Sequence, residues 1–154
     1  MLEVDFCFQN ELTGKENVFL TGSILGKSIL EIKEKYDQIV EFSTLEDFME
    51  TPLSYYSSGM RLKLGFSVFS EFVGDILLLD EVISVGDESF AKKSFQRIQD
   101  KIKELNSSVL FVSHNLDQVI NFCENSYVMD QGRFINYGPS SKMIDYYKKE
   151  VLKL

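Results

Sequence analysis

Two adjacent carboxylates and one histidine follow apolar stretches of this chain. The apolar run 76–79 leads directly into Asp80 and Glu81, and the apolar run 109–112 comes just before His114, the only histidine. At the end of a strand, the first carboxylate can orient Mg²⁺, often through water, and the second can polarise a water that attacks a phosphoryl group. His114 follows Asp80 by 34 residues, across one expected helix, so a right-handed crossover would place both at one sheet edge. Exposed strand-end acids and a surface or capping histidine are the alternative.

A third feature is the run Ser57, Ser58 and Gly59, which opens a long helical pattern. Small hydroxyl residues and a glycine at a helix N-terminus can bind an anion through backbone N–H groups and the helix dipole. An ordinary N-cap followed by a core helix has the same sequence pattern, so this run alone leaves both interpretations open.

The elements that must position these residues form a helical first half and an α/β second half. Thr13 with Glu16 and Ser28 with Glu31 are capping boxes that predict two helices, the second ending near Phe42. The two apolar runs predict strands buried on both faces, separated by an amphipathic helix over 88–105. The remaining expectations are a short helix over 44–49, a long helix from 57 to Gly74, a helix over 116–123, a hairpin of 126–130 and 133–137, and a last helix over about 140–149.

One stretch, Thr21 to Ser28, nearly matches a phosphate-binding loop of the form G-x-x-x-x-G-K-S. Thr21 stands where the first glycine belongs, and counting from Gly22 leaves one residue too few. Such a loop must follow a buried strand, whereas the segment before this one starts with a capping box and is expected to be a helix. We therefore interpret the stretch as a turn between two helices, with a true phosphate loop as the lesser alternative.

Composition limits the class of protein. The chain has 154 residues, 44% hydrophobic and 26% charged, which fits about one globular domain. A net charge of −8 speaks against a nucleic-acid surface, and no apolar run reaches the roughly 18 residues of a membrane span. Glu3 and Asp5 stand where a secretory signal would carry basic residues. Cys7 and Cys123 fit no metal spacing and are expected to be free thiols in a reducing cytoplasm.

Taken in order, these motifs resemble the ATP-binding subunits of ATP-binding-cassette (ABC) transporters. The run 56–60 looks like their signature motif, 76–81 like their Walker B strand with its catalytic glutamate, 84–87 like their D-loop, and His114 like their switch histidine. The particular residues of these motifs, together with those of the run 11–17, resemble the corresponding residues of the subunits that export teichoic acid, O-antigen or capsule polysaccharide. The resemblance implies an α/β fold, the C-terminal portion of the P-loop ABC-ATPase fold, with a helical signature lobe over about 13–73 and a Walker B and switch-histidine core over about 74–154.

The resemblance also implies roles for single residues. Glu81 and His114 would be catalytic, and Asp80 would orient Mg²⁺. The residues that would contact ATP are Ser57, Ser58, Gly59, Met60, Asp87 and, in the place of the usual Q-loop glutamine, Glu3. The expected partners are a second nucleotide-binding subunit and transmembrane permease subunits, on the cytoplasmic side of the membrane.

The sequence departs from the family pattern in one decisive respect. It begins after the strands, the adenine-stacking aromatic and the Walker A loop of such subunits. Asp80, Glu81 and His114 would therefore serve a nucleotide whose own Walker A loop is missing, whereas Ser57 to Gly59 would serve a nucleotide held by a partner. We expect negligible ATPase activity from the chain alone, and exposed strand edges and apolar faces that cause poor solubility or dimerisation.

Three classes of function remain at this point. The first is an ABC exporter subunit that is truncated and inactive alone. The second is a non-catalytic interaction module that pairs with a complete ATPase subunit. The third is a different P-loop NTPase that uses the stretch from Gly22 to Ser28.

Overall fold

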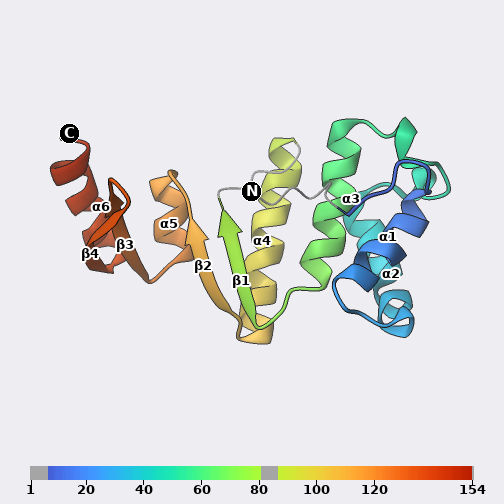
Figure 1. Cartoon of the computed structure of the whole chain (residues 1–154), viewed down its shortest axis with the longest axis horizontal. Helices are drawn as coiled ribbons and strands as arrows, with labels where there is room; N and C mark the ends of the chain where they lie inside the picture. The colour runs from blue at the N-terminus through green and yellow to red at the C-terminus, as the bar shows by residue number, and fades with distance from the viewer. Residues whose placement is uncertain (1–6, 81–86, 154) are drawn as a thin grey trace. The chain divides into compact units, whose positions relative to one another are not determined.

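The computed structural model describes residues 7–80 and 87–153, and these form two compact units that divide between Leu110 and Phe111 (Figure 1). The helices are α1 (Gly14–Ile24), α2 (Ile29–Ser43), α3 (Ser58–Glu71), α4 (Glu88–Leu105), α5 (Leu116–Phe122) and α6 (Ser140–Tyr146), with short 3-10 turns at Glu46–Phe48 and Leu53–Tyr55 and a π-helical turn at Tyr147–Val151. The strands are β1 (Ile76–Asp80), β2 (Ser108–Val112), β3 (Asn125–Asp130) and β4 (Arg133–Pro139). The domain division expected after residue 73 stays a prediction.

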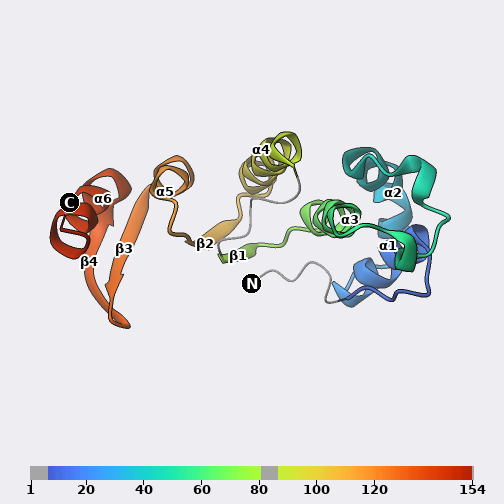
Figure 2. The same ribbon diagram turned by 90° about the horizontal axis from the view of Figure 1, so that it is seen from above.

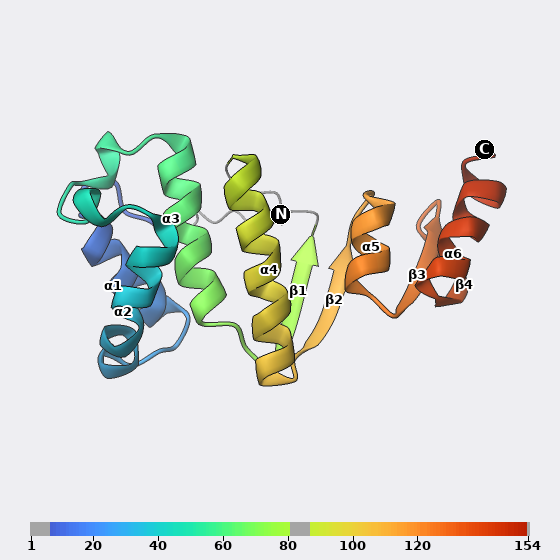
Figure 3. The same cartoon turned by 180° about the vertical axis from the view of Figure 1, so that it is seen from behind.

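Helices α1, α2 and α3 pack around one apolar core in the first unit. Both predicted capping boxes are confirmed: Thr13 and Glu16 close the start of α1, and Ser28 and Glu31 close the start of α2. Side chains from the three helices and the turns between α2 and α3 fill the core, among them Val18, Ile32, Ile39, Leu45, Met49, Leu53, Leu64 and Val68. Figure 3 shows α1 and α2 beside α3 from behind. Helix α3 ends at Glu71 rather than at Gly74 as expected, because Phe72 already leaves the helical conformation.

Strands β1 and β2 pair in a two-stranded sheet, and their arrows point the same way in Figure 1, with α4 as the crossover. Helix α4 lies over one face of β1, as Figure 2 shows from above. Leu77 and Leu79 are buried, whereas Ile76 and Leu78 on the other face are exposed. The expectation of strands buried on both faces is therefore wrong here, because none of the residues that the structure describes covers the second face.

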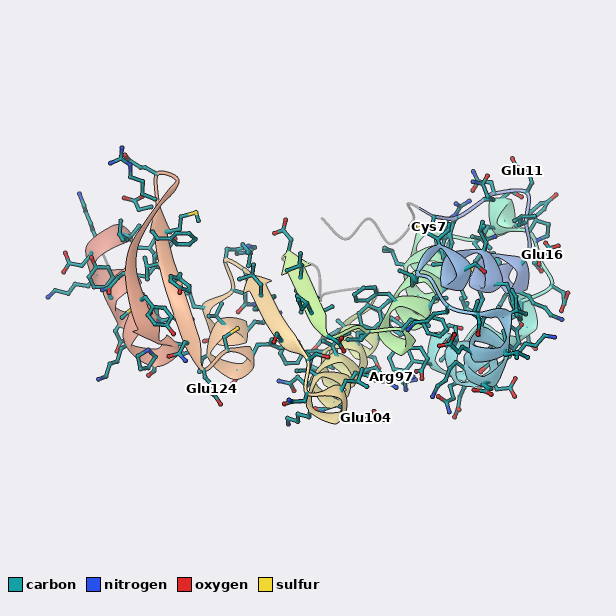
Figure 4. All side chains as sticks on the ribbon, turned by 60° about the horizontal axis from the view of Figure 1, so that its bottom comes forward. Cys7, Glu11, Glu16, Arg97, Glu104 and Glu124 are labelled. Atoms are coloured by element: carbon teal, nitrogen blue, oxygen red, sulfur yellow. The ribbon has the colours of Figure 1, made fainter. Side chains whose placement is uncertain are left out.

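A buried carboxylate ties α3 to α2 and α4. The side chain of Glu71 is fully buried near the end of α3 and forms ion pairs with Lys35 from α2 and with Arg97 and Lys101 from α4. Nitrogen–oxygen distances are 3.3 Å for Lys35 and 3.1 Å for Lys101. Arg97 is labelled on α4 in Figure 4. This network and the neighbouring aromatic cluster of Phe42, Phe66 and Phe90 hold α4 against the helical lobe.

The second unit contains the predicted hairpin and last helix. Strands β3 and β4 pair antiparallel across a turn in which Gln131 and Gly132 both have positive φ, as a two-residue hairpin turn requires. Val128 on one face is buried together with Met143 and Ile144 of α6. Cys7 in the first unit and Cys123 in the second are both free thiols, as expected.

Candidate functional site

The N-terminus of α3 presents Ser57, Ser58 and Gly59 at the surface of the helical lobe. Ser57 is the N-cap, and its Oγ accepts a hydrogen bond of 3.2 Å from the N–H of Met60. Both serines are exposed, while Gly59 and Met60 are half-buried. The first N–H groups of a helix have no acceptor within that helix, and they lie at the positive end of its dipole. This end of α3 can therefore bind an anionic group.

The chain that leads into α3 is held firmly by polar contacts. Tyr56 is buried, and its hydroxyl donates a 2.7 Å hydrogen bond to the carbonyl oxygen of Phe48. Arg61, one turn into α3, donates to the carbonyl oxygen of Leu53 at 2.7 Å and to the side-chain oxygen of Asn10 at 2.6 Å. Burial raises the pKa of Tyr56 to about 12, so this anchor stays protonated at neutral pH. The start of α3 is thus pre-positioned by its own chain.

Gly59 is not required by the packing of this chain. A Cβ atom at this position would meet only the Oγ of Ser57, at 3.9 Å, which is an ordinary contact. Its φ is also negative, so no left-handed conformation demands glycine. Glycine lowers the stability of a helix relative to alanine, so the fold of this chain gains nothing from it at this position. Its absent side chain leaves the backbone open to a ligand or partner group from outside the chain.

Asp87 is the N-cap of α4 and links this helix to α3. Its Oδ1 accepts a 2.9 Å hydrogen bond from the N–H of Phe90, and its Oδ2 lies 3.1 Å from the Nζ of Lys63. The N–H of Phe90 and then Lys63 lower the pKa of Asp87, which keeps it charged. Asp87 therefore positions the start of α4 relative to the first turns of α3. Lys63 was not singled out in the sequence, because a lysine within a helix gives no local sign of a partner 24 positions away.

Asp80 lies at the end of β1 and is exposed. The expected catalytic Glu81, the D-loop residues 84–86 and Glu3 lie outside the described residues. Among residues 7–80 and 87–153, no group of three or more acidic, histidine or cysteine side chains could hold a metal ion. Mg²⁺ usually takes one or two carboxylates together with phosphate oxygens and water, so an exposed strand-end Asp80 fits a metal brought with a nucleotide.

His114 belongs to the second unit and is exposed between β2 and α5. Its neighbours shape the turn: Asn115 caps α5 by accepting from the N–H of Gln118, and the Oγ of Ser113 accepts from the N–H of Asn115 at 3.0 Å. His114 thus follows the apolar strand and precedes the helix as expected. Its meeting with Asp80 at one edge stays a prediction.

The near-match to a phosphate loop is a helix–helix turn. Gly22 lies inside α1, where an added Cβ would be 2.8 Å from the side chain of Ile32, so this glycine permits close packing of α1 on α2. Gly26 has φ +80°, as a tight turn requires, and Ser28 is the N-cap of α2, where its side chain accepts a hydrogen bond from the N–H of Glu31. This segment joins two helices, whereas a phosphate loop of this kind must follow a strand. The interpretation as a turn between helices is therefore confirmed.

Comparisons with known proteins agree with the resemblance to ATP-binding subunits of ABC exporters. No protein-family model matches the chain. It is 41% identical over 149 residues to an O-antigen export system ATP-binding protein of Klebsiella pneumoniae, covering 97% of this chain and 60% of that protein. It is 37% identical over 149 residues to the teichoic acids export ATP-binding protein of Staphylococcus haemolyticus, covering 97% of this chain and 56% of that protein.

A solved structure, described as an ATP-binding subunit of an ABC transporter, superposes with a TM-score of 0.76 at 18% identity, over 91% of this chain and 58% of that one. The chain thus spans about three fifths of the length of these two curated relatives. It is a homologue of the ATP-binding proteins of ABC exporters for O-antigen and teichoic acids, and it carries part of the ABC-ATPase fold.

Proposed function

We propose that the chain acts as part of the ATP-binding machinery of an ABC transporter that exports a polysaccharide or lipid-linked glycan. Support comes from the names of its relatives, which are O-antigen and teichoic acid export proteins. In this proposal, ATP and Mg²⁺ are the cofactors, and a second nucleotide-binding subunit and a membrane permease are the partners. None of the described helices is long and apolar enough to cross a membrane. A peripheral position at the cytoplasmic face, through the permease, completes the proposal.

The observation that carries the proposal is the open, pre-positioned N-terminus of α3. The first turn of α3, at Ser57, Ser58 and Gly59, exposes backbone N–H groups beside a glycine with open space around it. Such a helix end suits the phosphates of an ATP molecule held by another subunit. In this proposal, Asp80, Glu81 and His114 act on a nucleotide that a Walker A loop binds. The signature segment, Ser57 to Gly59, contributes to the nucleotide site of another subunit.

The test is nucleotide-dependent assembly with a complete relative. The purified chain is mixed with the Klebsiella pneumoniae O-antigen export ATP-binding protein, with and without the non-hydrolysable analogue AMP-PNP and Mg²⁺, and the species are sized by analytical ultracentrifugation. We expect a one-to-one complex that forms only with nucleotide.

Gly59→Asp is the informative variant, because an aspartate in the first turn of a helix favours the helix dipole but repels phosphate. We expect it to keep the fold and lose the complex. Gly74→Asp is the matched control, because a side chain at Gly74 meets open space. A complex that ignores the nucleotide, or that Gly59→Asp leaves intact, would contradict the proposal.

A non-catalytic interaction module is the second candidate, favoured because the α3 terminus needs no nucleotide bound by its own chain. Dependence on nucleotide separates the two, because a module that needs no nucleotide would form the complex without AMP-PNP. Mg²⁺-dependent hydrolysis of ATP by the purified chain, abolished by Glu81→Gln, would exclude the module and would also contradict the expectation that the chain alone is inactive.

A further inference from the structure

Lys63 lies on α3, one turn after the exposed start of that helix. It follows Gly59 by four positions, and residues four apart in a helix share a face. Its Nζ lies 3.1 Å from Oδ2 of Asp87 and 5.4 Å from the centre of the Phe90 ring, both at the start of α4. Lys63 therefore joins the face of α3 that carries Gly59 to the first turn of α4, the helix beside α3 in Figure 3.

The Phe90 ring gives the Lys63 contact a defined geometry. Phe90 is buried and packs against Phe42 and Phe66, with ring centres 5.5 Å and 6.1 Å away. An ammonium group within about 6 Å of an aromatic ring is attracted to its face. Because the ring belongs to the core, the lysine that lies over it is held in place, although its partner Asp87 is largely exposed.

Asp87 already has a partner within the chain for each of its carboxylate oxygens. Oδ1 accepts a 2.9 Å hydrogen bond from the N–H of Phe90, and Oδ2 pairs with Lys63. A carboxylate repels phosphate, so these contacts suit a residue that links two helices better than one that binds a nucleotide directly. The position of Asp87 fixes where α4 begins relative to the exposed turn of α3.

We propose that Lys63 is a positioning residue of the nucleotide site. It acts through Asp87 to hold the start of α4 against the turn at Ser57 to Gly59, so that both segments meet the nucleotide-bearing subunit in one fixed arrangement. This inference rests on the proposed function, since it needs another subunit that holds the nucleotide. Neither Lys63 nor Asp87 contacts ATP in this role.

The experiment measures the dissociation constant of the complex with the Klebsiella pneumoniae relative, in AMP-PNP and Mg²⁺, by isothermal titration calorimetry. Lys63→Met keeps an unbranched apolar stem but removes the charge. We expect it to raise the dissociation constant about 3- to 10-fold, as for a side chain that acts on a binding site through another residue. Lys63→Arg keeps the charge and should restore most of the affinity.

A double-mutant cycle separates positioning from direct contact. Asp87→Asn removes the charge but keeps the cap of α4, because asparagine caps a helix about as well as aspartate. If Lys63 and Asp87 act only as a pair, Lys63→Met, Asp87→Asn and the double variant should weaken the complex by the same factor. A pair with only a structural role would lower the urea midpoint and leave the affinity of the folded chain unchanged, so all variants are compared where circular dichroism shows them to be folded.

Lys92→Met is the matched control. Lys92 lies on the same helix α4, and its ion pair with Glu88, at 2.9 Å, is exposed and stays within that helix. The substitution removes the same charge without touching α3, so it should leave the dissociation constant unchanged.

Three results would overturn the role of Lys63. They are an unchanged affinity in Lys63→Met, a loss that Lys63→Arg does not restore, and a further loss when Asp87→Asn is added to Lys63→Met. The absence of any nucleotide-dependent complex with the unaltered chain would instead overturn the proposed function, and this role with it.

Discussion

The substitution Glu71→Gln should destabilise the chain strongly although Glu71 lies outside every motif. The Glu71 side chain is fully buried, and it is the shared counter-ion of Lys35, Arg97 and Lys101. A neutral amide of the same shape keeps the packing but leaves three cations without their carboxylate. Removing one partner of a buried ion pair typically costs about 3–5 kcal/mol. The cations are partly exposed, from 16% for Lys101 to 41% for Lys35, and can recover some hydration, so we expect about 3 kcal/mol, the lower end of that range.

The assay is urea unfolding followed by circular dichroism. With a slope of roughly 1–3 kcal/mol per molar urea, a loss of about 3 kcal/mol moves the midpoint down by about 1–3 M. Glu88→Gln is the matched control, because Glu88 pairs with Lys92 on the exposed surface of α4 and should cost less than about 1 kcal/mol. If the urea midpoint of Glu71→Gln falls no lower than that of Glu88→Gln, the buried ion pairs of Glu71 do not stabilise the chain as reasoned here.

The same network predicts a dependence on pH. Burial alone would raise the pKa of Glu71, but the hydrogen bond from Lys101 and the charges of Arg97 and Lys101 outweigh it, so the pKa lies below its ordinary value. A depressed pKa means that the charged carboxylate stabilises the fold above the pKa of the unfolded chain, near pH 4, and loses this effect as the pH falls through the folded pKa. The difference between wild type and Glu71→Gln should therefore shrink in acid.

Three further predictions concern local contacts. Gly22→Ala should cost about 1–3 kcal/mol in urea unfolding, because the new Cβ would press on Ile32, whereas Gly74→Ala, with open space around it, should cost far less. Ser28→Ala should cost about 1 kcal/mol, because it removes the N-cap of α2; a loss near zero would show that the cap contributes nothing. Asp87→Asn should lower the melting temperature at pH 7, and this loss should shrink as the pH falls below the ordinary carboxyl range, because the depressed pKa of Asp87 means that its charge stabilises the fold only above its folded pKa; a loss that does not change with pH would exclude the charge as the cause.

Local rules were enough to predict most of the elements. The capping boxes at Thr13 and Ser28 depend on residues three positions apart, and the turn at Gln131 and Gly132 on two neighbours. Helix α4 begins and ends where its amphipathic period predicts, at Glu88 and Leu105. Such signals are contained in a few adjacent residues, so they can be recognised without knowledge of the tertiary fold.

Contacts between distant segments could not be predicted in this way. Glu71 meets Arg97 and Lys101, 26 and 30 positions later, and nothing in the sequence of α3 marks a buried carboxylate. The exposure of Ile76 and Leu78 was also missed for β1, because an apolar strand indicates that both faces should be covered but not whether a covering layer is present. The motif order predicted the relationship to ABC exporter ATP-binding proteins, while the positions of Glu3 and Glu81 lie outside the described residues.

Photo-labelling can test whether Ser57 to Gly59 contact a nucleotide held by another subunit. The Klebsiella pneumoniae relative is loaded with Mg²⁺ and an ATP analogue that carries a photo-reactive aryl azide on its γ-phosphate, this chain is added, and the labelled peptides are mapped by mass spectrometry. We expect label on the peptide that contains residues 57–60 of this chain, and we expect Gly59→Asp to abolish it. Label confined to the relative, or on this chain only at other positions, would contradict it.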